Sequence, residues 1–239
     1  MDTILVVGMN GAIGKAVSLF FKEQGFTCIG TSSQKQASKN SGSAKKSVTK
    51  KNLLSEPLFL DLQDPQSITD LAKVVPTLAG IVFCAGLKPS ANLAETTLEH
   101  HQQMMQLHVS GPLFVVKALQ NKVKKNGAIV FISSIAAQKG SYDPSYAIAK
   151  SAVTGMTRTL ANELSAKKIR VNAIAPGLVK DTPVHKGMTP DFREKHLKQT
   201  LLNQLTTASD CVEAIYFLFT QQQMTGQVVH INGGQYFGN

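Results

Sequence analysis

The sequence contains no tryptophan and only three cysteines, Cys28, Cys84 and Cys211. The cysteines are odd in number, widely spaced and without a Cys-x-x-Cys pair, which argues against a disulfide framework and a structural zinc site. The histidines show no metal-ligand spacing with a carboxylate, so no metal is expected. No uncharged apolar run approaches the roughly 18 residues that span a bilayer, and the chain start lacks the charged region of a secretory signal. We therefore expect a cytoplasmic protein without membrane association.

Acidic side chains are scarce relative to basic ones, since 15 Asp and Glu against 25 Lys and Arg give a formal net charge of +10. Such an excess favours acidic partners, such as a phosphorylated cofactor, an acidic protein or nucleic acid. Six lysines and no acid lie between Thr31 and Ser55. We expect a mobile basic loop at about residues 34–55, either solvated or in contact with a cofactor phosphate or an acidic partner. Aromatic residues do not alternate with these lysines, so nucleic-acid binding is a minor hypothesis.

Hydrophobic residues make up 43% of the chain, enough for a substantial core. Short apolar runs alternate with segments of helical periodicity, a pattern typical of a doubly wound parallel sheet. We predict a single Rossmann-type α/β domain over residues 1–239, with helices on both faces of the sheet. The predicted strands are 3–7, 26–30, 58–60, 81–85, 128–132, 170–174 and 227–231, and the predicted helices are 13–23, 67–75, 98–121, 144–166 and an interrupted stretch at 191–220.

A glycine-rich turn separates the first predicted strand from the first helix. Gly8 permits a tight turn, the middle of the turn lets the backbone approach a pyrophosphate, and Gly14 allows close packing of helix and strand. The free N–H groups at the start of the helix favour a phosphate. The pattern therefore predicts a dinucleotide site that contains Gly8, Asn10, Gly11, Ala12, Ile13 and Gly14.

The end of the second predicted strand indicates which dinucleotide binds. A carboxylate about 20 residues beyond the glycine turn would hold the 2′-hydroxyl of the adenosine ribose. Here the sequence at residues 30–35 is instead Gly-Thr-Ser-Ser-Gln-Lys. The hydroxyls of Ser32 and Ser33 and the ammonium of Lys35 suit a 2′-phosphate better than a free ribose. We therefore favour NADP(H) over NAD(H) as the cofactor.

A serine, a tyrosine and a lysine follow the fifth predicted strand at a spacing that indicates catalysis. Ser134 comes directly after the strand, and a helix then begins with Tyr146 and Lys150. Residues at i and i+4 share one face of a helix. A phenol has a pKa of about 10, and a neighbouring ammonium favours its ionised form, so we expect Lys150 to lower the pKa of Tyr146. Ser134 can donate a hydrogen bond to a substrate carbonyl.

Together these motifs resemble the classical short-chain dehydrogenase/reductase family along nearly the whole chain. The resemblance implies hydride transfer between a nicotinamide and the substrate, with Tyr146 as proton donor or acceptor and Ser134 orienting the carbonyl. It implies that Lys150 lowers the pKa of the tyrosine and binds the nicotinamide ribose. Further cofactor contacts implied by the resemblance come from Asp61, Leu62, Cys84, Ala85, Gly86, Ile132, Pro176, Gly177, Val179 and Thr182.

The sequence departs from the usual pattern of that family at several points. Ala12 fills the middle of the glycine turn, and Cys84 stands where the resemblance implies an asparagine that makes a hydrogen bond on the nucleotide side. Thr182 lies one position later than the family's threonine. The fourth catalytic residue, an asparagine, aligns with His108. This histidine either holds a water of the proton relay and titrates near neutral pH, or is merely packed in its helix.

Within the family, the segment at residues 226–236 is most similar to 3-oxoacyl-[acyl-carrier-protein] reductases. That resemblance implies docking of an acidic acyl carrier protein by basic residues beside the active-site cleft, and the matching positions are Lys125 and Lys167. A predicted substrate lid at about 183–205 holds apolar residues that suit an acyl or ring pocket, or simple helical packing. The family also implies a homotetramer or homodimer.

The sequence thus predicts an NADPH-dependent reductase that converts a carbonyl to a secondary alcohol, with a 3-oxoacyl thioester on a carrier protein favoured over a small-molecule carbonyl. One alternative is a dehydrogenase of a sugar, polyol or secondary-metabolite alcohol. Another is a nucleotide-binding regulator without turnover. The changes at Cys84 and His108 favour the regulator, whereas the intact Ser134, Tyr146 and Lys150 argue against it.

Overall fold

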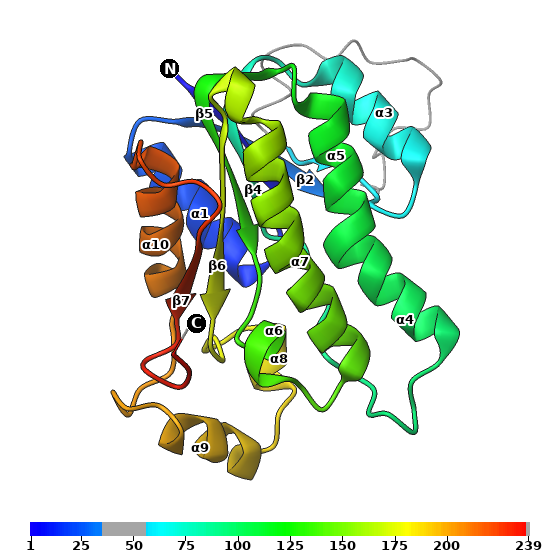
Figure 1. The fold of residues 1–239 in the computed structure, drawn as a ribbon, viewed down its shortest axis with the longest axis vertical. Coiled ribbons are helices and arrows are strands. Elements are labelled where there is room, and N and C mark those ends of the chain that lie inside the picture. The colour runs from blue at the N-terminus through cyan, green and yellow to red at the C-terminus, as the bar shows by residue number, and fades with distance from the viewer. Residues whose placement is uncertain (35–55, 238–239) are drawn as a thin grey trace.

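The computed structural model describes residues 1–34 and 56–237 and contains a seven-stranded parallel sheet with the order β3-β2-β1-β4-β5-β6-β7 (Figure 1). The predicted doubly wound fold is confirmed. The predicted basic loop at 34–55 lies, from residue 35 on, outside the described residues. The strands are β1 Thr3–Val7, β2 Thr27–Ser32, β3 Leu58–Phe59, β4 Leu78–Phe83, β5 Val123–Ile132, β6 Arg170–Pro176 and β7 Val228–Ile231.

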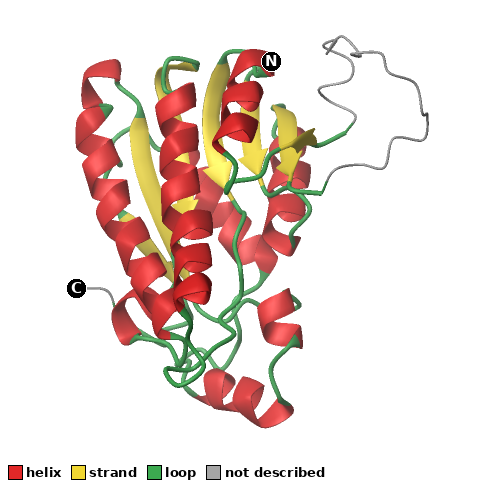
Figure 2. Ribbon diagram, turned by 90° about the vertical axis from the view of Figure 1, so that its right-hand side faces the viewer, coloured by secondary structure: helices red, strands yellow, loops and turns green. Residues whose placement is uncertain are grey.

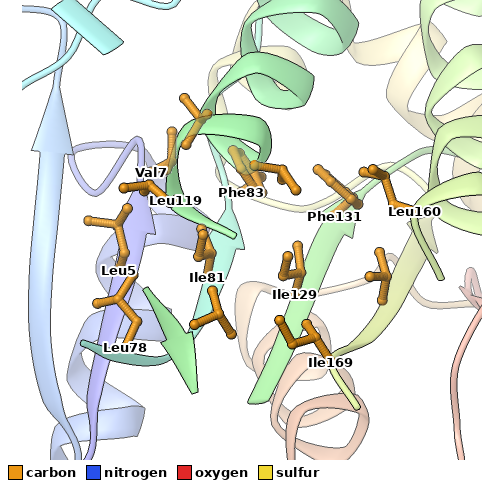
Figure 3. Packing of buried hydrophobic residues seen from close by; sticks show 14 of the residues in the cluster. Leu5, Val7, Leu78, Ile81, Phe83, Leu119, Ile129, Phe131, Leu160 and Ile169 are labelled. Carbon is orange, nitrogen blue, oxygen red and sulfur yellow. The ribbon is translucent and has the colours of Figure 1, made fainter. Parts of the chain in front are cut away.

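Side chains of the central strands alternate between two helical layers, because successive strand residues point to opposite faces. Leu5 and Val7 of β1 face one core with α3, α5 and α7, while Ile4 and Val6 face the other with α1 and α10. Figure 2 shows the resulting helix–sheet–helix layers, and Figure 3 shows Leu119 and Leu160 beside the strand residues of the first core. The bounds of these helices are α1 Ala12–Glu23, α3 Pro65–Val74, α5 Gly111–Leu119, α7 Pro144–Glu163 and α10 Ala208–Thr220.

The helix predicted over 98–121 is present as an uninterrupted helical stretch over 98–119, but it is not α-helical throughout. It consists of α4 Leu98–Met105, a π-helical turn η1 over Gln106–Ser110, and α5. Pro112 has no N–H to donate to the carbonyl four residues earlier, which disfavours regular α-helical bonding across this turn. Such π-turns within helices often occur at functional sites, and this one carries His108.

Four short elements complete the fold of the described residues. Three of them are single turns, which are too short to show periodicity, whereas the fourth, over 190–198, falls within the interrupted helical stretch predicted at 191–220. They are α6 Ala136–Lys139, the 3-10 turn η2 Ser165–Lys167, α8 Pro183–Lys186 and α9 Pro190–Lys198. The last two occupy most of the predicted lid at 183–205. In Figure 1, α6, α8 and α9 lie at the edge toward which the strands of the sheet point.

The parallel sheet therefore brings the loops after β1, β4, β5 and β6 to one edge, where ligands of such folds bind. Lys125 and Lys167 lie at the opposite edge, because Lys125 is near the amino end of β5 and Lys167 lies in η2, just before β6 begins. Within the described residues, no helix is both long and apolar enough to cross a membrane.

Candidate active site

A cavity of about 760 Å³ opens at the carboxyl edge of the sheet. Its walls are the loops that follow β4, β5 and β6, the first turns of α7, and the lid helices α8 and α9. A second cavity of about 530 Å³ continues from it past the glycine turn to the end of β2. The two cavities share Gly11 and the segment Cys84–Leu87, so together they form one elongated binding site.

The first turn of α7 holds Tyr146 at the cavity through an extensive cap. The fully buried carboxylate of Asp143 accepts hydrogen bonds from the backbone N–H of Tyr146 at 3.0 Å and of Ser90 at 2.9 Å. It also accepts from the Ala91 N–H at 3.4 Å and lies 3.0 Å from the His100 Nε2. Burial raises the pKa of Asp143, but these bonds outweigh it and leave the pKa below its usual value. The cap therefore fixes the catalytic helix against α4 and the loop after β4.

Tyr146, Ser134 and Lys150 come together as the sequence predicts. Lys150 Nζ lies 5.6 Å from the centre of the Tyr146 ring and donates a 2.9 Å hydrogen bond to the Ile132 carbonyl. The Ser134 hydroxyl hydrogen bonds to the Tyr146 phenol and accepts from the Ala136 N–H at 3.1 Å. The three side chains thus line one cavity at its inner end.

The direction of the Tyr146 pKa shift differs from the expectation. Burial raises the pKa of Tyr146 to about 12, although the hydrogen bond from Ser134 lowers it in part. Burial also lowers the pKa of Lys150 to about 7, so this lysine is only partly charged at neutral pH. The expected net decrease of the phenol pKa is therefore not found in this structure, because loss of solvent is the largest cause of the shift.

His108 is buried beside Tyr146, with the centres of the two rings 5.7 Å apart in an edge-to-face arrangement. Its Nε2 accepts a 3.3 Å hydrogen bond from the N–H of Leu87. Burial, and then the charge of Lys150, holds the pKa of His108 well below its ordinary value. The expectation that this histidine titrates near neutral pH is therefore wrong, and the ring is a neutral acceptor that fixes the loop after β4.

The glycine turn fits a dinucleotide pyrophosphate. Gly8 has φ +83° and packs so closely on the loop after β4 that an added Cβ would lie 2.5 Å from the Ala85 nitrogen. Gly11, by contrast, faces the cavity with only the Gly8 carbonyl nearby. Gly11 also begins α1 without a side-chain cap. The other described helices of eight or more residues that follow a loop all have a side-chain cap; they are α3, α4, α7, α9 and α10. Among these described helices, α1 alone therefore leaves its first N–H groups without a side-chain cap and free for an anion.

The end of β2 forms the far wall of the second cavity. The Ser32 hydroxyl accepts hydrogen bonds from Asn10 Nδ2 at 2.9 Å and from the Gln34 N–H at 3.2 Å. Among the described residues no acceptor takes the proton of this hydroxyl, which a ligand could therefore accept. Ser33 is exposed beside it, and Asp61 is the sole acid among the described residues that line this cavity. Lys35 lies outside the described residues. The hydroxyls thus stand where a ribose-binding carboxylate would be expected.

Nearly all residues predicted for the site line one of the two cavities. Gly14 does not, because it is buried under the glycine turn, where its Cα packs on the Gly8 carbonyl. Thr182 does, although its hydroxyl is engaged in donating to the Val179 carbonyl at 2.8 Å and capping α8. Asp143 was missed, and its position before Pro144 at the start of a helix is the N-cap signal that could have identified it.

The comparisons with known proteins agree with this geometry. A family model described as enoyl-(acyl carrier protein) reductase matches residues 8–235. A 3-oxoacyl-[acyl-carrier-protein] reductase of Thermotoga maritima is 30% identical over 239 aligned positions, with 96% of each chain covered. The chain belongs to the short-chain dehydrogenase/reductase family. It is accordingly an oxidoreductase, and its long binding site serves a nicotinamide cofactor.

Solved structures of this family superpose closely on the chain. A short-chain dehydrogenase family protein from Francisella tularensis has a TM-score of 0.83 at 27% identity, with 98% of both chains covered. A structure described as ElxO with NADP bound has a TM-score of 0.81 at 28% identity and the same coverage. Both belong to the same α/β architecture as the fold described above.

The position expected for Lys125 and Lys167 from the family resemblance differs from their position in this chain. Lys125 and Lys167 were expected beside the active-site cleft, but they lie at the amino ends of β5 and β6, across the sheet from the cavity. Lys167 Nζ instead donates to Gln120 Oε1 and Asn121 Oδ1, both at 2.7 Å. Besides Lys150, the lysines that line the cavity are Lys88, Lys139 and Lys195.

Proposed function

We propose that the protein is an NADPH-dependent reductase that converts the carbonyl of a 3-oxoacyl thioester into a secondary alcohol, within one domain that spans residues 1–239. The observation that carries this proposal is the meeting of Tyr146, Ser134 and Lys150 at the inner end of a cavity that continues into a dinucleotide-shaped groove. Bound NADPH would supply the hydride to the carbonyl carbon. The similarity to the Thermotoga maritima reductase supports the thioester as substrate.

Each of the three catalytic residues has a distinct part. Ser134 donates a hydrogen bond to the substrate oxygen and holds the carbonyl near the phenol. Tyr146 is protonated at neutral pH because its pKa is about 12, and it therefore gives its proton to the oxygen as negative charge develops. Lys150 stabilises the tyrosinate that remains, since loss of the phenol proton raises the benefit of a nearby ammonium. His108 keeps the loop after β4 closed over this group.

The preference for NADPH over NADH rests on the end of β2. Ser32 can donate its hydroxyl proton, Ser33 is exposed, and neither position offers the carboxylate that selects a free ribose 2′-hydroxyl. The structure described as ElxO with NADP bound supports the same choice. We also propose Asp61 and Leu62 at the adenine, since both line this cavity, and Pro176, Gly177 and Val179 at the nicotinamide.

The test is steady-state reduction of an acetoacetyl thioester with NADPH and with NADH in parallel, followed by nicotinamide absorbance. We expect turnover with NADPH, and we expect Tyr146→Phe to abolish it while the dissociation constant for NADPH stays within about twofold. Equal turnover by Tyr146→Phe would refute the assigned proton donor. NADPH binding without reduction of any ketone or oxidation of any small alcohol would favour a nucleotide-binding regulator.

A further inference from the structure

The outer end of the larger cavity is positively charged and contains no compensating acid. Among the described residues, no aspartate or glutamate lines this cavity, whereas Lys88, Lys139, Lys195 and His196 do. Leu87, Met188 and Phe192 are among the apolar residues that line the same cavity. The catalytic group and the basic group are connected by α6, since Ser134 precedes this single turn and Lys139 ends it.

Lys139, Lys195 and His196 form a group together with two glutamines. The Lys139 Nζ donates to Gln199 Oε1 at 2.7 Å, and the same oxygen accepts from Gln235 Nε2 at 3.0 Å. Gln235 Nε2 also lies 3.1 Å from His196 Nδ1. The group thus joins α6, α9 and the segment after β7, three parts of the chain that are far apart in sequence.

The positive charges of this group repel one another without relief from a carboxylate. In the described part of the chain, neither Lys139 nor Lys195 forms an ion pair, although Lys198 on the outer face of α9 pairs with Glu194 at 2.6 Å. The pKa of Lys139 is lowered by burial and then by Lys195, and that of His196 by burial and then by both lysines. An anion bound between them would relieve this repulsion and strengthen its own hydrogen bonds.

We propose that the substrate carries an anionic oxygen group, a phosphate ester or a carboxylate, which Lys139 and Lys195 bind at the mouth of the cavity while the carbonyl lies at Ser134 and Tyr146. This inference deepens the proposed function and rests on it. Gln199 orients Lys139, and the apolar lining of the cavity takes the carbon chain of the substrate. Lysine suits this task as a point charge on a flexible stem, which tolerates either type of anion.

The experiment compares three 3-oxo compounds with the same reacting carbonyl. Acetoacetyl-coenzyme A carries phosphates at the end of its pantetheine arm, the acetoacetyl thioester of N-succinylcysteamine carries a carboxylate at the end of a shorter arm, and the acetoacetyl thioester of N-acetylcysteamine is neutral. We expect one of the two anionic compounds to exceed the neutral thioester in kcat/KM by about tenfold or more at low salt. The compound that does so identifies the source of the anion. Added salt should reduce this advantage.

Two variants and a matched control assign the effect to the group. Lys139→Gln and Lys195→Gln should each raise KM for the preferred anionic compound about five- to tenfold, with kcat nearly unchanged and the neutral thioester unaffected. Lys198→Gln removes a lysine from the same helix, but one that faces away from the cavity, and should change neither constant. Lys195→Arg keeps the charge and should retain most of the affinity.

The outcomes separate this inference from the proposed function. The anion site is refuted if the neutral thioester has the same kcat/KM as both anionic compounds. It is also refuted if Lys139→Gln and Lys195→Gln have the same KM as the control Lys198→Gln. In both cases the reductase function stands. If no 3-oxo compound is reduced although NADPH binds, the proposed function itself fails. Circular dichroism of each variant checks that a raised KM does not come from misfolding.

Discussion

Removal of the Asp143 carboxylate should weaken the protein far more than removal of an ordinary helix cap. The side chain is fully buried and is the acceptor for the N–H groups of Ser90, Ala91 and Tyr146, and it contacts His100. Loss of an N-cap costs about 1 kcal/mol, and each buried donor left without a partner costs about 1–3 kcal/mol. With about 1 kcal/mol for the cap and about 2 kcal/mol for each of one to two stranded donors, Asp143→Ala should lower the free energy of unfolding by about 3–5 kcal/mol.

Urea unfolding at neutral pH measures this loss, with Thr207→Ala as the matched control. Thr207 caps α10 in an exposed capping box remote from the cavity, so its removal should cost only about 1 kcal/mol. The variant at Asp143 should also lower kcat, because the first turn of α7 holds Tyr146 in place. Equal losses of stability in the two variants would refute the idea that Asp143 does more than cap its helix.

The same network makes a prediction for acid. The pKa of Asp143 is lower in the folded protein than the value of about 3.9 in an unfolded chain. Its contribution is therefore complete above that value and is lost as the pH falls through the folded pKa. The stability difference between the wild type and Asp143→Asn should accordingly shrink below about pH 4. A difference that stays constant down to about pH 2 would contradict this account.

Three further predictions concern backbone, packing and pH. Gly8→Ala should lower the free energy of unfolding, measured by thermal unfolding, by about 3–5 kcal/mol, because the new side chain would combine a positive φ with a clash on Ala85. The control Gly25→Ala has nearly the same φ but nothing within 4 Å of the added Cβ, and it should cost about 1–2 kcal/mol. Arg170→Met should lower the free energy of unfolding in urea by about 2–3 kcal/mol, since the Arg170 guanidinium donates to the Leu218 and Phe219 carbonyls at the end of α10. Arg158 is exposed, so the control Arg158→Met should lower it by less than about 0.5 kcal/mol. His108→Asn should leave the apparent pKa values of the pH–rate profile unchanged between about pH 6 and 9, because the imidazole is already neutral there; a lost inflection in that range would show that His108 titrates.

Local sequence patterns were sufficient for the sheet and for the identities of most site residues. Apolar runs bounded by turn residues predict all seven strands, with the largest error at β5, which begins at Val123 rather than Ala128. The π-helical turn within the helix predicted over 98–121 was missed, since such a turn depends on packing as well as on Pro112. The four-residue helix α6 was missed because one turn shows no periodicity.

The chain by itself determined which groups are available: a glycine turn before a helix, a serine after a strand, and Tyr146 and Lys150 one helical turn apart. Only the tertiary structure decided how those groups behave, because pKa values depend on burial, which segments distant in sequence create together. Burial reverses the expected shift at Tyr146 and keeps His108 neutral. The direction of the strands likewise places Lys125 and Lys167 away from the cavity. Two segments far apart in sequence bring Lys139 and Lys195 to its mouth, and Gln235 from a third segment hydrogen bonds to Gln199 behind them.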